Sequence, residues 1–193
     1  MTPARLAVLG RVARAVLALP APGTLRVGID GVDGAGKTMF ADELRDVLAP
    51  SGRSVIRAGV DAFHNPKPIR YRLGRHSPEG FYRDSSGRFR RAIFDVDADV
   101  VVDAPDERAD PGSILLFDGI FLHRPELRRY WDFSVFLHVE WARNHRVRRH
   151  PHQASPRYAE GQAIYLRECR PGECASVLID NHDLAGPFIV RQP

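Results

Sequence analysis

The chain has 193 residues, of which 44% are hydrophobic and 27% are charged, and its formal net charge is +4. This length is that of one domain with its own core, so we expect residues 1–193 to form a single domain. The composition is that of an ordinary globular protein, without low-complexity tracts or a visible repeat. The basic residues are scattered rather than aligned with aromatics, and no stretch is long and apolar enough to cross a membrane. We therefore expect neither a nucleic-acid partner nor a membrane partner.

The N-terminal segment has two interpretations, because residues 1–29 contain several arginines and no acidic residue. An Arg-rich amphipathic leader could be an organelle transit peptide. Against this, residues 2–3 supply an N-cap and a first-turn proline, and apolar residues recur on one helical face, namely Leu6, Leu9, Ala13 and Val16. We favour a structural helix within residues 1–20 of a cytoplasmic protein. The spacing of Cys169 and Cys174 fits no zinc or redox signature, which indicates reduced thiols.

Residues 28–38 read GIDGVDGAGKT and have the spacing of a phosphate-binding P-loop. Glycines let the backbone take positive φ and turn its N–H groups toward a polyphosphate. Lys37 adds a charge at the β/γ end, and the Thr38 hydroxyl can hold Mg²⁺. A short apolar strand is expected before the loop, over residues 25–29, and a helix after it, over residues 39–48. The predicted nucleotide-binding residues are Gly31, Asp33, Gly34, Ala35, Gly36, Lys37, Thr38 and Met39.

The rest of the chain alternates apolar runs with helical patterns. The runs predict strands over residues 54–60, 114–117, 134–139 and 176–179, and helical spacing covers residues 141–149 and 156–168. Alternating strands and helices imply a parallel sheet with helices on both faces. The predicted fold is therefore α/β: a three-layer P-loop NTPase domain with a five-stranded, mostly parallel sheet.

Acidic residues follow two of these strands, Asp61 after the second and Asp118 after the third. Because the carboxyl ends of parallel strands share one edge of the sheet, we expect both carboxylates to face the P-loop. Phosphoryl transfer needs a phosphate cradle, Mg²⁺, a group that deprotonates the acceptor, and nearby cations. We predict that Thr38 and Asp118 serve the metal and that Asp61 is the general base. The alternative for each aspartate is a strand-end cap.

Residues 62–112 are rich in Pro, Gly, Arg and Asp, with two tyrosines and four phenylalanines. Such a stretch is either disordered or a substrate-closing insertion, and the aromatics favour an acceptor-binding insertion. Within it, Tyr82 could stack on a base, and Glu79 or Asp84 could accept from sugar hydroxyls. His64 lies close to Asp61 in sequence and could also contact the acceptor, or it is an exposed loop histidine.

Arginines recur along residues 141–149, and those spaced by three share one helical face. An Arg-bearing lid over residues 141–160 would neutralise charge in the transition state and exclude water. Arg146 and Arg149 are the preferred arginines of this lid. With Lys37 and Asp61, they are the predicted catalytic residues. The alternative is a solvated basic face.

Taken in order, residues 31–44, residues 61–64 (DAFH) and residues 116–121 (LFDGIF) resemble the uridine kinase and phosphoribulokinase family of P-loop kinases. The resemblance implies ATP-dependent phosphorylation of the 5′-hydroxyl of uridine or cytidine. It implies that Asp61 is the catalytic base, that Asp118 serves the metal, and that Arg146 and Arg149 match the phosphate-binding arginines of the lid. The helix after the lid carries acceptor contacts in that family, which here match Arg157 and Gln162.

The resemblance leaves the acceptor open, because residues 77–84 do not reproduce the acceptor-binding stretch of a standard uridine kinase. Our first hypothesis is a kinase that uses ATP and Mg²⁺ to phosphorylate a small-molecule acceptor, with a nucleoside first. The alternatives are a kinase for another alcohol, such as a sugar, pantothenate or ribosylnicotinamide, and a regulator that binds ATP without turnover. The paired acids favour catalysis.

Overall fold

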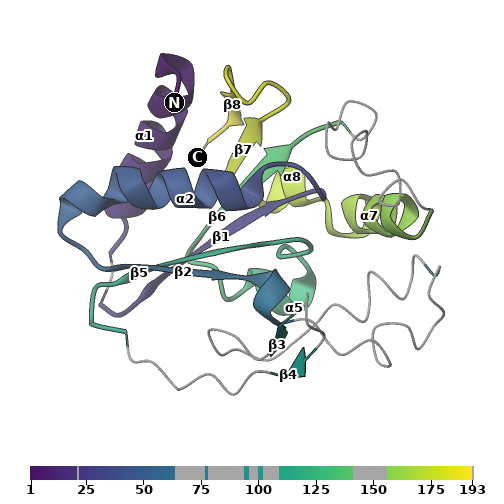
Figure 1. Ribbon diagram of the computed structural model, residues 1–193, viewed down its shortest axis with the longest axis horizontal. Coiled ribbons are helices and arrows are strands. Elements are labelled where there is room, and N and C mark those ends of the chain that lie inside the picture. The colour runs from purple at the N-terminus through teal and green to yellow at the C-terminus, as the bar shows by residue number, and fades with distance from the viewer. Residues whose placement is uncertain are drawn as a thin grey trace.

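The computed structural model describes residues 1–20, 22–63, 77, 94–95, 100–101, 109–140 and 156–192 (Figure 1). Its α-helices are α1 (Pro3–Leu17), α2 (Lys37–Leu48), α5 (Pro125–Arg128), α7 (Pro156–Cys169) and α8 (Pro171–Cys174), and its 3-10 helices are η1 (Ala49–Ser51) and η2 (Val60–Phe63). Its strands are β1 (Leu25–Gly31), β2 (Val55–Gly59), β3 (Phe94–Asp95), β4 (Val100–Val101), β5 (Ile114–Gly119), β6 (Phe133–His138), β7 (Val177–Asp180) and β8 (Phe188–Arg191).

The main sheet has the strand order β2-β5-β1-β6-β7-β8. Its first five strands are parallel, and β8 runs antiparallel to β7. The predicted α/β fold with a mostly parallel sheet is confirmed, whereas the predicted count of five strands is one too low. The missed strand, β8, lies at the sheet edge with Phe188 and Val190 exposed. It follows β7 without an intervening helix, so the alternation of strands and helices did not predict it.

The sheet lies between two layers of helices, and its strands alternate side chains between them (Figure 1). On β6, Phe133, Val135 and Leu137 join the cluster that contains the buried residues of α1 and α2. Phe136 faces the other way and packs with Tyr165 of α7. Both faces of the central strands are buried, which is why they read as continuous apolar runs.

The N-terminal helix is part of this core. Thr2 caps α1, its Oγ1 accepting from the backbone N–H of Arg5 at 3.3 Å, and Pro3 occupies the first turn. Leu9, Val12 and Val16 are fully buried in the same cluster as the apolar face of α2. Residues 3–17 thus form a helix that packs in the core, as the structural-helix interpretation of this segment expects. No helix among the described residues has the length and apolar character needed to cross a bilayer.

The predicted insertion and lid fall mostly outside the described residues. Within residues 62–112, β3 and β4 form a two-stranded antiparallel sheet, and β3 lies against η2, the turn that carries Asp61. Ser77 accepts a hydrogen bond through its backbone oxygen from Nη1 of Arg157 at 2.9 Å, which joins the insertion to the first turn of α7. The acceptor-binding role of residues 62–112 and the lid at residues 141–160 remain predictions.

Candidate active site

The P-loop connects β1 to α2 at the carboxyl edge of the sheet, and its glycines are needed for two different reasons. Gly34 and Gly36 have φ of 75° and 81°, a region that favours glycine. Gly31 does not have positive φ. A Cβ on Gly31 would lie 2.8 Å from the backbone oxygen of Leu137 on β6, so this position needs glycine for space. The sequence-based explanation by positive φ is therefore wrong for Gly31.

Helix α2 begins at the end of this loop with its N-terminus open to an anion. Gly36 is the N-cap in the left-handed conformation and supplies no side-chain hydrogen bond. The first N–H groups of a helix have no acceptor within the helix, and the helix dipole favours negative charge beside them. The loop backbone and the start of α2 thus have the donor geometry that a phosphate group needs.

The Lys37 side chain folds back onto the backbone of the loop. Its Nζ donates to the backbone oxygen of Val32 at 2.9 Å. Burial lowers the pKa of the Lys37 ammonium below its usual value, and the nearby carboxylates of Asp33, Asp30, Asp61 and Asp118 oppose that shift. Lys37 is therefore a partly desolvated cation within electrostatic reach of both predicted active-site acids, Asp61 and Asp118.

Thr38 and Asp118 meet across the edge of the sheet. The Thr38 hydroxyl donates to Oδ2 of Asp118 at 2.7 Å, which joins the start of α2 to the end of β5. Both groups are oxygen donors of the kind that Mg²⁺ prefers, and Mg²⁺ is usually held by only one or two protein oxygens, with waters and substrate phosphates completing its shell. The residues present therefore fit a magnesium site of this kind.

Asp61 lies in η2, directly after β2, with an exposed side chain. The turn packs closely on the end of β5. A Cβ added to Gly119 would lie only 2.6 Å from Cβ of Val60. The Asp61 carboxylate is exposed to solvent and lies within electrostatic reach of Lys37. The structure thus brings the P-loop, Asp61 and Asp118 to one edge of the sheet.

Two of the predicted acceptor residues are buried on α7. Gln162 accepts through Oε1 from the backbone N–H of Asp33, and its Nε2 donates to the backbone oxygen of Tyr158 at 3.0 Å. Gln162 thus contacts the P-loop itself, and Arg157 contacts the insertion through Ser77. The remaining predicted residues, His64, Glu79, Tyr82, Asp84, Arg146 and Arg149, lie outside the described residues.

Asn181 was not predicted as part of the site. It follows β7, is buried, and donates through Nδ2 to the backbone oxygen of Ala35 at 2.8 Å. Arg5 of α1 donates in turn to Asn181 Oδ1 at 3.2 Å. Its position directly after a predicted strand was the available signal, since polar residues at the carboxyl ends of parallel strands face the ligand edge.

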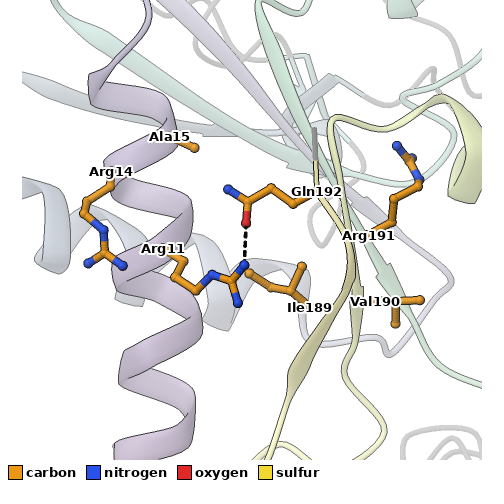
Figure 2. A pocket seen from close by; sticks show the side chains of 7 residues that line it. All are labelled: Arg11, Arg14, Ala15, Ile189, Val190, Arg191 and Gln192. Carbon is orange, nitrogen blue, oxygen red and sulfur yellow. Dashed lines mark hydrogen bonds between the residues drawn. The ribbon is translucent and has the colours of Figure 1, made fainter.

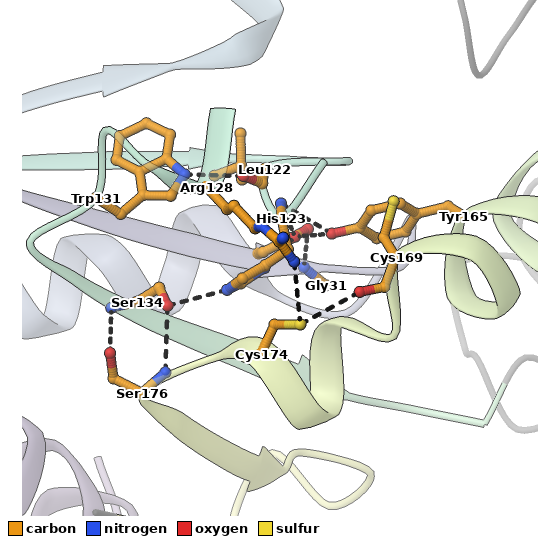
Figure 3. A network of polar contacts seen from close by, with 11 residues as sticks. Gly31, Leu122, His123, Arg128, Trp131, Ser134, Tyr165, Cys169, Cys174 and Ser176 are labelled. Atoms are coloured by element: carbon orange, nitrogen blue, oxygen red, sulfur yellow. Dashed lines mark hydrogen bonds and ion pairs between the residues drawn. The ribbon is translucent and has the colours of Figure 1, made fainter. Parts of the chain in front are cut away.

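A buried polar network lies behind the P-loop (Figure 3). Asp30 on β1 is fully buried and accepts from the backbone N–H of Gly31 at 2.7 Å and from the Tyr165 hydroxyl. His123 places Nδ1 at 2.7 Å from Asp30 Oδ2 and Nε2 at 2.9 Å from Ser134 Oγ. This Asp-His-Ser order is that of a hydrolytic triad, but Ser134 is buried. We therefore assign the network to structure.

The Tyr165 hydroxyl is a donor in this network. Burial, together with the adjacent Asp30 carboxylate, raises the pKa of Tyr165 far above its usual range, so the hydroxyl keeps its proton. Its ring packs edge-on against Phe121 with centroids 5.0 Å apart. The hydroxyl therefore joins α7 to β1 at the base of the P-loop, and the ring joins α7 to the segment after β5.

Replacing Tyr165 with phenylalanine is expected to lower the free energy of unfolding by about 1.5–3 kcal/mol, the usual worth of a hydrogen bond to a charged group. The ring packing remains, so the loss reports the hydroxyl alone. Urea unfolding at pH 7 measures it. Tyr130→Phe is the matched control, because Tyr130 is 47% exposed; it should stay within about 0.5 kcal/mol. Equal stability of the two variants would contradict the assignment.

A hollow of about 660 Å³ lies between α1 and β8 (Figure 2). Arg11 donates across it to Oε1 of Gln192 at 3.0 Å. Gln192 follows Arg191, which pairs with Leu178 near the amino end of β7. This hollow therefore lies toward the amino ends of the parallel strands, whereas the P-loop lies at their carboxyl ends. The lining residues described include none of the predicted site residues. We therefore place the active site at the P-loop edge.

Comparison with known proteins supports the fold. No protein-family model and no curated protein matches the sequence. Among solved structures, a possible uridine kinase from Bacillus stearothermophilus is similar with a TM-score of 0.71 and 22% identity, covering 88% of this chain and 96% of that one. A proposed fructose transport system kinase from a Silicibacter species has a TM-score of 0.57 and 23% identity, covering 86% and 94%. At these identities the similarity shows the fold alone. That fold is the predicted three-layer P-loop fold.

Proposed function

We propose that the protein is a phosphotransferase that moves the γ-phosphoryl group of ATP to a hydroxyl group of a small molecule. The observation that carries this proposal is the contact between Thr38 of the P-loop and Asp118 of β5, with Lys37 and Asp61 beside them. A phosphate cradle, a site for Mg²⁺ and an exposed carboxylate together meet the requirements of phosphoryl transfer.

The nucleotide would bind along the P-loop. The backbone N–H groups of the loop and of the first turn of α2 would hold its phosphates, and the Lys37 ammonium would move from the Val32 carbonyl to the β- and γ-phosphate oxygens. Met39 and Leu184 are 40% and 43% exposed and both lie beside Gly36. They offer an apolar surface next to the phosphate site, which suits a flat base.

Thr38 and Asp118 would hold Mg²⁺, which when bound neutralises charge on the β- and γ-phosphates. In the protein itself, the Thr38 hydroxyl and one oxygen of Asp118 face each other at 2.7 Å. Asp118 is largely buried, so its carboxylate is held in one orientation rather than moving freely in water.

Asp61 would act on the acceptor. Its carboxylate takes the proton of the acceptor hydroxyl as that oxygen forms its bond to the γ-phosphorus, and the bond from the γ-phosphorus to the β-γ bridging oxygen breaks, releasing ADP. Lys37 stays beside the oxygens that gain negative charge. An exposed side chain at the edge of the sheet allows the acceptor to approach without movement of the core.

For the acceptor, we propose the 5′-hydroxyl of uridine or cytidine. The support is the resemblance at residues 31–44, 61–64 and 116–121, and the similarity to a structure described as a possible uridine kinase. A sugar is the second candidate, because another protein with this fold is described as a fructose transport system kinase.

The test is a panel of nucleosides and sugars, each incubated with the purified protein, ATP and Mg²⁺ while ADP release is followed. We expect uridine or cytidine to stimulate ADP release and to yield the 5′-monophosphate. Stimulation by a sugar alone would replace the nucleoside with the second candidate. If ATP binds but no acceptor stimulates its turnover, the protein is a nucleotide-dependent regulator and the proposed activity is wrong.

A further inference from the structure

Arg57 is a charged residue in the middle of β2, and its side chain links β2 to β5 and to α2. Its Nη2 donates to Asp118 Oδ1 at 2.9 Å, its Nη1 to the backbone oxygen of Leu116 at 3.0 Å, and its Nε to Asp42 Oδ1 of α2 at 3.0 Å. The Arg57 side chain is 17% exposed and that of Asp118 is 10% exposed. The contact between them is thus partly shielded from water.

The two oxygens of Asp118 have separate partners. Oδ1 receives Arg57, and Oδ2 receives the Thr38 hydroxyl. Gly59 leaves room for this arrangement, since a Cβ there would lie 3.2 Å from Asp118 Oδ1. Because one oxygen is held by Arg57 and the other by Thr38, the plane of the Asp118 carboxylate is fixed with an oxygen toward the P-loop. Without Arg57 that plane would be free to rotate about the bond from Cβ to Cγ.

We propose that Arg57 is a positioning residue for the magnesium site, acting through Asp118. The inference rests on the proposed function, because it assigns Asp118 to the metal. Groups that hydrogen-bond to metal ligands fix their orientation, and their loss usually lowers metal affinity or activity by about 10–100-fold.

Charge alone would argue the other way, since a guanidinium repels a nearby cation. Here the carboxylate of Asp42 lies 3.0 Å from Arg57 Nε and offsets that charge. Asp42 is 48% exposed, so its contribution is modest but of the right sign. With the repulsion reduced, the orientation of Asp118 is the larger effect. Replacing Arg57 should therefore weaken metal binding rather than strengthen it.

The test measures metal binding without turnover. Wild type and Arg57→Met are titrated with Mn²⁺ in the presence of ATP and no acceptor, with bound Mn²⁺ read by electron paramagnetic resonance. ATP binding in EDTA is measured by calorimetry in parallel. We expect Arg57→Met to bind Mn²⁺ at least about 10-fold more weakly, and metal-free ATP binding to change less than about twofold. Arg57→Lys should recover part of the affinity, because an ammonium can reach Asp118 but cannot hold three acceptors in a fixed plane.

Arg26→Met is the matched control. Arg26 makes an ion pair of similar length, with Nη2 2.8 Å from Asp132 Oδ1, at the opposite end of the parallel strands. Its loss should leave Mn²⁺ binding unchanged.

Four results would overturn the inference. Unchanged Mn²⁺ binding in Arg57→Met would contradict the positioning role of Arg57 and leave the proposed function intact. An equal loss of metal-free and metal-dependent ATP binding would assign Arg57 to general structure. If Arg57→Met does not fold, the same comparison is made with Arg57→Lys, for which undiminished Mn²⁺ binding is the contradicting result. Wild-type protein that binds no ATP with or without Mn²⁺ overturns the proposed function, and this inference with it.

Discussion

Replacing Asp61 with asparagine is expected to abolish acceptor-stimulated ADP release while ATP binding stays intact. An amide of the same shape cannot take the proton of the acceptor hydroxyl, and loss of a general base typically costs about 10²–10⁴-fold in rate. Asp61 is exposed at the carboxyl edge of the sheet, so the substitution leaves the core unchanged. Steady-state ADP release measures the rate, and calorimetry with ATP measures the binding.

The matched control for Asp61 is Asp46→Asn. Asp46 lies on α2 with 67% of its side chain exposed and pairs only with Arg45 among the ion pairs described. Its loss should leave turnover unchanged. Normal turnover in Asp61→Asn would show that another group takes the proton, and the role of η2 in the reaction would have to be reassigned.

Lys37→Met is expected to abolish turnover and to weaken ATP binding strongly. The substitution keeps most of the side-chain length but removes the charge from the β/γ end of the phosphate site. Calorimetry with ATP and the ADP-release assay measure the two effects. Arg45→Met, which removes a cation from the surface of the same helix, is the control and should alter neither.

Lys37→Met is not expected to destabilise the folded protein. Because the pKa of Lys37 is lowered in the folded protein, the folded state binds that proton less tightly than the unfolded state. Below that pKa, the charge on Lys37 therefore opposes folding. We expect the melting temperature of ligand-free Lys37→Met to stay within about 2 °C of wild type or to rise. A large fall would show that loss of activity reflects unfolding.

Local patterns along the chain were sufficient for most of the fold. The apolar runs placed β1, β2, β5, β6 and β7 to within about two residues, and the helical spacing placed α1, α2 and α7. They succeed because each strand of a sheet buried on both faces carries its own apolar run, and each helix its own apolar face. The parallel topology followed from their alternation, and from it followed the meeting of the P-loop with Asp61 and Asp118.

The contacts that complete the candidate site could not be read in this way. Asp118 meets Arg57, Asp30 meets Tyr165, and Asp33 meets Gln162, each across many residues of sequence. A charged residue inside a buried strand, as at Arg57 in the predicted strand 54–60 and at Asp30 in β1, indicates that a buried partner is required, since burying an unpaired charge is costly. Which partner it finds depends on the strand order and on how the helices lie over the sheet. Side-chain periodicity is local, whereas pairing is decided only when distant segments pack together.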